Sequence, residues 1–155
     1  MNKSAILAIA IAATTALTGV GYAVAQSPAA SIEQRQAAMK MNGASMKTLV
    51  PMARGEAPWN QAAAVQALEN LHRVGQQTVA MFPRGSGAES GTKTAALAAI
   101  WDKAPEFTAA AKAQSDAAEA LLRAARANDE AAFKAGFAAM GRTCAGCHEG
   151  FRAKQ

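Results

Sequence analysis

EFTAAAKAQSDAAEALLRAARA, residues 106–127, decides the fold class of this chain. The stretch contains no glycine or proline, and its many alanines and leucines are strong helix formers. The sequence on both sides of it is also rich in alanine and poor in β-branched side chains, which is typical of an all-helical protein. We therefore expect one long helix here and an all-α fold around it.

Two further helices are expected upstream of this stretch. The first covers about residues 31–53, where Ser31 can act as the N-cap and Pro51 is expected to kink the helix or end it early. The second follows Asn60, a suitable N-cap, and runs to about residue 82, because a proline comes next. A short turn rich in glycine and proline separates the two helices.

The stretch between the second helix and residue 106 is the most loop-like part of the chain. Residues 84–93, RGSGAESGTK, are rich in glycine and serine. Residues 94–101 form either a short helix or part of a long connection, interrupted near Pro105. Further along, Asn128 or Asp129 caps a last helix that runs towards the C-terminus. Four helices without any strand pattern predict an antiparallel four-helix bundle.

The first 25 residues have the pattern of a secretory signal peptide. Lys3 is followed by a long apolar stretch and then by Ala-Val-Ala at residues 23–25, a suitable cleavage site. The stretch is long enough for an uncleaved anchor, but its alanine, threonine and glycine content favours cleavage. We therefore expect a signal peptide at 1–25, one domain at 26–155, and no membrane attachment after cleavage.

The charge of the chain excludes some partners. The formal net charge is +5, but basic and acidic residues are interspersed, and aromatic residues make up only 5% of the chain. This pattern does not indicate nucleic-acid binding. It is compatible with weak electrostatic steering of an acidic protein partner.

The sequence TCAGCHEG, residues 143–150, holds both cysteines of the chain, with a histidine directly after the second. On a helix, Cys144 lies one turn before Cys147 and His148, so the three side chains share one face. Four large side chains lie on the same face: Phe133, Phe137, Met140 and Phe151. A flat group bound by the two sulfurs would therefore meet the imidazole side-on.

Three other uses of a Cys-x-x-Cys pair fit this chain poorly. A zinc site needs about four ligands, and the only other histidine is His72. A thioredoxin-like pair belongs at a strand-to-helix junction, and a disulfide across so short a loop would stabilise little. In Cys-x-x-Cys-His, the thiols add to haem vinyl groups and the histidine binds the iron. We therefore expect one haem c attached to Cys144 and Cys147, with His148 as the proximal iron ligand.

The residue on the second axial face of the iron decides between functions. A methionine or a second histidine there suits electron transfer, whereas an apolar residue leaves room for small gases. Helical periodicity places Met39 and Met46 on the inner face of the first helix and points Met41 to solvent. His72 is a further candidate, although its ring would need a partner to orient it. Periodicity alone does not choose between Met39 and Met46.

Several motifs together resemble the class II c-type cytochromes, the cytochrome c′ group. CAGCHEGFR at residues 144–152 is similar to the family's CxxCH ending followed by an aromatic and a basic residue. MKMNG at 39–43 is similar to the Met-Lys-x-Asn-Gly stretch of low-spin, methionine-ligated members called cytochrome c-556. The similarity continues through GEAPWNQAAAVQAL at 55–68 and MFP at 81–83. It covers essentially the whole chain beyond the signal segment.

The resemblance implies roles for two residues of the first helix. Met39 would be the distal iron ligand, in agreement with its place on the inner helix face. Arg35, one turn before it, matches a position where cytochrome c′ proteins carry an arginine near a haem propionate, and a guanidinium suits such a bidentate pair. The four large side chains on the face of the motif are expected to wall the haem.

The resulting expectation is a periplasmic protein that carries single electrons between redox partner proteins. No nucleophile or acid–base set accompanies the motif, so we do not expect an enzyme. The alternative is a haem protein that binds nitric oxide or carbon monoxide, since the residue at the Met39 position is often a non-ligating leucine in cytochrome c′ itself. The resemblance also leaves a homodimer open, because related proteins often dimerise through their first two helices.

Overall fold

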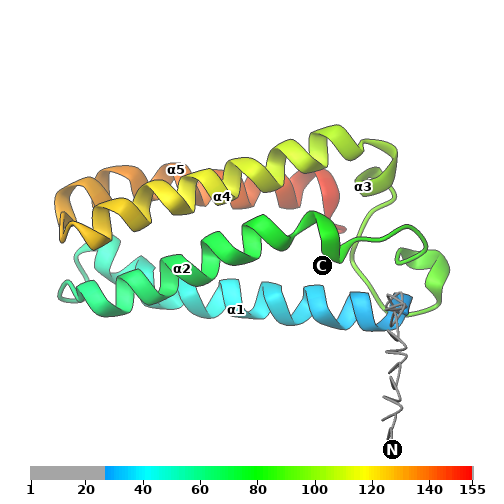
Figure 1. Ribbon diagram of the computed structural model, residues 1–155, viewed down its shortest axis with the longest axis horizontal. Helices are drawn as coiled ribbons and strands as arrows, with labels where there is room; N and C mark the ends of the chain where they lie inside the picture. The colour runs from blue at the N-terminus through cyan, green and yellow to red at the C-terminus, as the bar shows by residue number, and fades with distance from the viewer. Residues whose placement is uncertain (1–26, 155) are drawn as a thin grey trace, which may run out of the picture.

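The computed structural model describes residues 27–154, and this part of the chain contains helices but no β-strand (Figure 1). The four long helices are α1 (Pro28–Arg54), α2 (Gln61–Gln77), α4 (Ala104–Arg126) and α5 (Glu130–Phe151). The α2–α4 connection holds two 3-10 turns, η1 (Val79–Met81) and η2 (Ala88–Ser90), and the short helix α3 (Ala99–Asp102). The predicted antiparallel four-helix bundle is confirmed. The predicted signal peptide lies outside the described residues.

Helix α1 extends beyond both predicted ends. The Ser27 hydroxyl caps it by accepting an N–H of the first turn at 3.2 Å. Pro28 occupies the first helical position, where a backbone N–H would have no partner within the helix. Ser31, the predicted cap, is a buried residue inside the helix. Pro51 lies within the helix and does not end it. The helix ends at Gly55, whose φ of 74° is left-handed, as glycine permits.

Helix α2 begins as predicted but ends earlier. The Asn60 side chain caps it by accepting an N–H of the first turn at 3.0 Å. The helix stops at Gln77, five residues short of the predicted end. The Thr78 hydroxyl donates to the carbonyl of Val74 at 2.8 Å, and the chain then tightens into the 3-10 turn η1.

The starts of α4 and α5 follow from local chemistry. Helix α4 begins at Ala104 with Pro105 in its first turn, so this proline starts a helix rather than interrupting one. The Asp129 carboxylate caps α5 by accepting an N–H at 2.9 Å. Asn128, the other predicted cap, has a left-handed φ of 55° and forms the turn between the helices.

The apolar core is divided between the two halves of the bundle. The larger cluster takes side chains from all four long helices, mainly from the half that contains the α1–α2 and α4–α5 turns. Its largest fully buried members are Leu49, Leu68, Leu71, Phe133 and Met140. A smaller cluster of Ala38, Val74 and Met81 lies towards the other half. The half in which α5 ends therefore has the smaller core.

Helices α2 and α4 approach closely at Gly75. A Cβ atom on this glycine would lie 3.0 Å from the Ser115 Cα atom and 2.9 Å from its Cβ atom. The buried Gln114 beside it donates from its side-chain amide to the carbonyl of Leu71 at 3.2 Å. Glycine is therefore required here by the distance between the two backbones.

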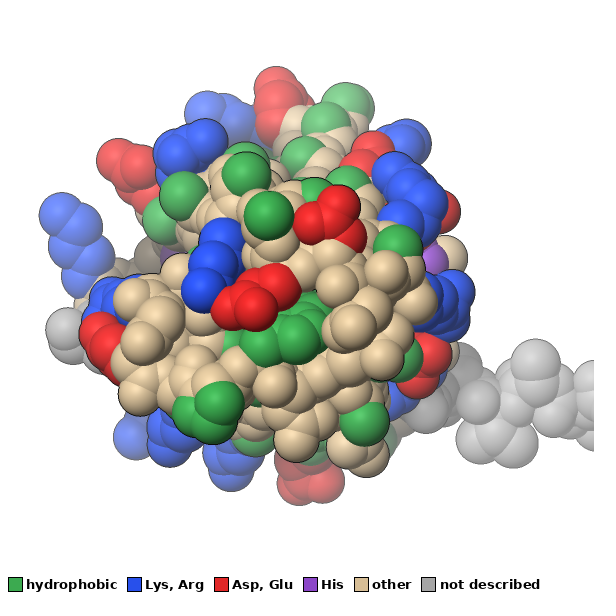
Figure 2. All heavy atoms as spheres, turned by 90° about the vertical axis from the view of Figure 1, so that its left-hand side faces the viewer, with side chains coloured by type: hydrophobic (Ala, Val, Ile, Leu, Met, Phe, Trp, Pro, Cys, Tyr) green, Lys and Arg blue, Asp and Glu red, His purple; other side chains and the backbone are tan. Residues whose placement is uncertain are grey.

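The two ends of the bundle differ. At one end α1 and α4 begin, α2 and α5 end, and the long connection passes over them (Figure 1). The opposite end, shown in Figure 2, carries basic and acidic side chains mixed with small apolar patches. Between residues 27 and 154, no helix has the length and apolar character needed to cross a membrane.

Candidate functional site

The Cys-x-x-Cys-His motif lies in the last turns of α5. Cys144, Cys147 and His148 are half-buried, and the two thiols are not joined in a disulfide. Among the described residues, no group of three or more His, Cys, Asp or Glu side chains could hold a metal ion. The structure therefore brings the two sulfurs and the imidazole together without forming a zinc site of the usual kind in the part of the chain that it covers.

Burial favours the neutral forms of these three groups. It raises the pKa of the Cys144 thiol, and it raises the pKa of Cys147, to which the neighbouring Cys144 adds. Burial also lowers the pKa of His148, and the positive charge of Arg152 lowers it further. A neutral imidazole with an available lone pair is the form that binds a metal.

Backbone hydrogen bonds fix the end of α5 against the α2–α4 connection. The N–H of Leu97 donates to the carbonyl of Phe151 at 3.1 Å, and the N–H of Ala153 donates to the carbonyl of Ala95 at 2.8 Å. The two bonds form an isolated antiparallel bridge. The motif is thus held by its own helix and by the connection that follows α2.

Three aromatic rings gather where α5 ends. The Phe107 ring of α4 lies 5.0 Å from the Phe82 ring and 5.2 Å from the Phe151 ring, measured between centroids, with both pairs edge-to-face. Phe151 was expected near the site, whereas Phe82 and Phe107 were not. The apolar periodicity of residues 106–127 could have indicated Phe107 as an inward residue, because Phe107, Ala111 and Ala118 are all buried on one face.

Phe133 and Phe137 do not lie beside the motif. The Phe133 ring is fully buried in the larger core cluster, 5.0 Å from the Trp59 ring and 5.4 Å from the Phe137 ring. Because a helix rises about 1.5 Å per residue, Phe133 lies about 16 Å from Cys144 along α5. Both rings share the face of the motif but pack in the larger core cluster, several turns of α5 before it in the case of Phe133. That the rings wall a haem stays a prediction. Met140 also belongs to the larger cluster.

Met39 lies at the edge of the buried face of α1. Ala38 beside it is buried, while Met39 is 36% exposed and Met41 is 41% exposed. The amide nitrogen of Asn42 lies 3.9 Å from the Met39 sulfur. Met46, the other candidate ligand, packs against the larger core cluster. Of the two candidates, Met39 is therefore the one that does not pack against that cluster.

His72 is engaged between α2 and α4. Its Nδ1 atom lies 3.1 Å from the carbonyl oxygen of Ser115, and its Nε2 atom lies 3.0 Å from the amide nitrogen of Gln76. With the proton on Nδ1, the ring donates to Ser115 and accepts from Gln76, so both nitrogens have partners. The structure therefore gives no support to His72 as an iron ligand.

Arg35 is buried, with only 3% of its surface exposed. Its guanidinium donates to the Ser86 hydroxyl at 2.8 Å, to the Ser86 carbonyl at 2.6 Å and to the Thr94 hydroxyl at 2.9 Å. It also lies 4.5 Å from the centre of the Phe82 ring. Burial lowers the pKa of Arg35, and the nearby Glu89 carboxylate raises it. The guanidinium is thus directed into the α2–α4 connection, a role that the sequence did not indicate.

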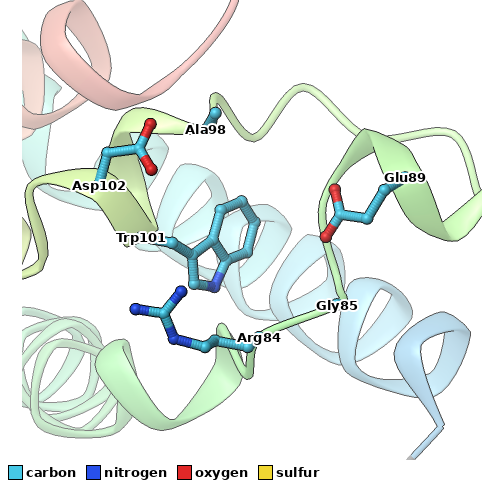
Figure 3. Close-up of a pocket in the computed structure, with 6 residues that line it drawn as sticks. All are labelled: Arg84, Gly85, Glu89, Ala98, Trp101 and Asp102. Carbon is cyan, nitrogen blue, oxygen red and sulfur yellow. The ribbon is translucent and has the colours of Figure 1, made fainter.

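A hollow of about 200 Å³ opens on the connection (Figure 3). It is lined by Arg84, Gly85, Glu89, Ala98, Trp101 and Asp102. Figure 3 shows the Trp101 ring between the two carboxylates. The Trp101 indole N–H donates to the carbonyl of Phe82 at 3.0 Å. No residue of the Cys-x-x-Cys-His motif lines this hollow, so it is separate from the candidate site.

A protein-family model described as Cytochrome C′ matches residues 30–152. The chain belongs to the cytochrome c′ family. The predicted resemblance to class II c-type cytochromes is therefore confirmed. The match covers nearly all of the domain expected at 26–155.

Members of the cytochrome c′ family with two different names are similar to this chain. A cytochrome c′ of Pararhodospirillum photometricum is 43% identical over 126 residues, covering 81% of this chain and 98% of the relative. A cytochrome c-556 of Agrobacterium fabrum is 32% identical over 127 residues, covering 82% and 84%. A nitric oxide complex of a cytochrome c prime variant from Alcaligenes xylosoxidans matches the fold with a TM-score of 0.73 and 27% identity, covering 82% and 97%.

The residues of this cytochrome fit the haem c that its family implies. Two unpaired thiols three positions apart and an imidazole directly after them are the donors that covalent attachment requires. The edge-to-face rings of Phe82, Phe107 and Phe151 add apolar surface where α5 ends. The smaller apolar core of this half of the bundle is compatible with a large apolar cofactor between the helices.

Removal of both thiols is expected to abolish covalent haem attachment. The double variant Cys144→Ala, Cys147→Ala should lose all haem on denaturation, whereas either single variant keeps one thioether. Intact-mass spectrometry of denatured protein measures this directly, with the wild type carrying the mass of one haem. Haem that stays on the denatured double variant would contradict the assignment of these cysteines.

Proposed function

We propose that this cytochrome carries single electrons in the periplasm. Cys144 and Cys147 would attach one haem c, His148 would be the proximal ligand and Met39 the distal ligand. When bound, the haem iron supplies the one-electron couple. The observation that best supports this proposal is that the α2–α4 connection is hydrogen-bonded both to Arg35, one turn before Met39 on α1, and to Phe151, three residues after His148 on α5.

The protein's own contribution is to fix the two helices that carry the ligand side chains. Met39 and His148 both belong to helices that are tied to the same connection. Ligands that stay the same in both oxidation states would limit structural reorganisation during electron transfer. We propose no enzymatic activity, because no nucleophile or acid–base set accompanies the motif. The expected partners are redox proteins of the periplasm, and the resemblance to cytochrome c′ proteins leaves a homodimer open.

The visible spectrum of the purified mature protein tests the proposal. It should be recorded oxidised, reduced, and reduced under carbon monoxide. Sharp, split α and β bands that carbon monoxide does not change are the expected result for iron with His and Met ligands. A broad reduced band that shifts under carbon monoxide would contradict the proposal.

That contrary spectrum would favour a second function, the binding of nitric oxide or carbon monoxide. Two observations support this alternative. The Alcaligenes xylosoxidans protein of the same fold was solved with nitric oxide bound. The Met39 side chain, 36% exposed, is also not locked in place by core packing, so a gas could displace it.

A further inference from the structure

The buried guanidinium of Arg35 joins α1 to the α2–α4 connection. It donates three hydrogen bonds of 2.6–2.9 Å to Ser86 and Thr94, which lie 51 and 59 residues further along the chain. Hydrogen bonds from a charged donor are shorter and stronger than those between neutral groups. A charge this deeply buried is costly unless its donors are satisfied. Arg35 therefore supplies three of the hydrogen bonds that hold the connection on α1, and the exposed Gln36 amide adds another by donating to the Lys93 carbonyl at 3.0 Å.

The same connection is bonded to the end of α5. Thr94, the acceptor for Arg35, directly precedes Ala95, whose carbonyl accepts the N–H of Ala153 at 2.8 Å. The N–H of Arg152 in turn donates to the carbonyl of His148 at 3.1 Å. A continuous chain of hydrogen bonds and single peptide links thus runs from α1 to His148.

A second path between the same elements runs through aromatic rings. The Arg35 guanidinium lies 4.5 Å from the centre of the Phe82 ring, which packs on Phe107, which packs on Phe151. Cation–π and edge-to-face contacts of this kind are attractive, because the ring face is negative and the ring edge positive. Both paths begin at Arg35 and reach the last residues of α5.

We propose that Arg35 is a positioning residue that sets the place of Met39 relative to His148. This inference rests on the proposed function, in which the two are the axial ligands. Arg35 and Met39 are one turn apart on α1, so a shift of α1 against the connection would move Met39. In this role the guanidinium acts through its three hydrogen bonds within the protein, whereas a propionate partner would act on the haem itself.

The first test is hydrogen exchange on the haem-loaded protein with Arg35→Met, which keeps an unbranched apolar stem and removes the charged donors. Loss of a charge-assisted bond should raise amide exchange in the peptides holding Leu97 and Ala153 by about tenfold to a hundredfold. The reduced protein should also bind carbon monoxide more readily. Arg73→Met, at an exposed arginine bonded only to Asn70 among the described residues, is the control and should change neither.

The other outcomes separate this proposal from its competitors. Unchanged exchange in Arg35→Met would overturn it, as would faster exchange with an unchanged spectrum and carbon monoxide response. A changed pH dependence of the potential without faster exchange would indicate a propionate partner instead. Met39→Leu should open the iron to carbon monoxide without faster exchange, so failure of the ligand assignment is seen separately. If Arg35→Met does not fold, Thr94→Val removes one acceptor and should give a smaller effect of the same sign.

Discussion

Met39→Leu is expected to make the reduced protein bind carbon monoxide, which leaves the spectrum of the reduced wild type unchanged. The leucine side chain fills similar space but has no sulfur lone pair to offer the iron. If the methionine-bound state outnumbers the open state by about 100 to 1, its loss raises the apparent carbon monoxide affinity about a hundredfold. Carbon monoxide titration of the reduced protein, followed by its visible spectrum, measures this change.

Met41→Leu is the matched control for this experiment. Met41 lies two residues further along α1 and is 41% exposed, close to the 36% of Met39, so both substitutions remove a thioether of similar exposure. Only the Met39 variant should change the spectrum and spin state. An unchanged spectrum in Met39→Leu would refute Met39 as the distal ligand and favour the gas-binding alternative.

The second large effect is expected at the α2–α4 contact, where Gly75→Ala should destabilise the bundle. The new Cβ atom would lie 3.0 Å from the Cα atom of Ser115, and backbone cannot move aside as a flexible side chain can. Overpacking of this kind costs about 1–3 kcal/mol, which exceeds the gain of about 1 kcal/mol that alanine brings to a helix interior. We expect a net loss of about 1 kcal/mol in the free energy of unfolding, which is the middle of the overpacking range less the gain in helix propensity.

Gly43→Ala provides the same chemical change without the contact. Gly43 lies inside α1, and no atom within 4 Å would meet its new Cβ. It should gain about 1 kcal/mol from helix propensity. The two variants should therefore differ by about 2 kcal/mol, and by about 8 °C in the Tm of thermal unfolding. Equal stability of the two proteins would show that α2 and α4 do not pack as closely as described.

The features that were predicted correctly depend on residues close together in the chain. The helix at 106–127, the Asn60 and Asp129 caps and the shared face of the Cys-x-x-Cys-His motif all follow from bonds and spacings within one or two turns. The errors at helix ends were also local: Ser27 competed with Ser31 as a cap, and the Thr78 hydroxyl ended α2 early.

The composition of the site could be predicted only in part. Helical periodicity gives the face on which a side chain lies but not its depth in the bundle or its neighbour on another helix. Phe133 was therefore assigned to the motif, although its partner is Trp59 in the main core. For the same reason, periodicity could not show that Met46 packs against the main core whereas Met39 is 36% exposed.

By itself, the sequence determined the all-helical class, the position of the Cys-x-x-Cys-His motif on the last helix and the resemblance to the cytochrome c′ family. Only the tertiary structure decided that Arg35 is buried in the α2–α4 connection, that Phe82 and Phe107 meet Phe151, and that Gly75 must have no side chain. The physical reason is the same for all three. Each depends on a contact between segments far apart in the chain, and such contacts arise only when helices pack.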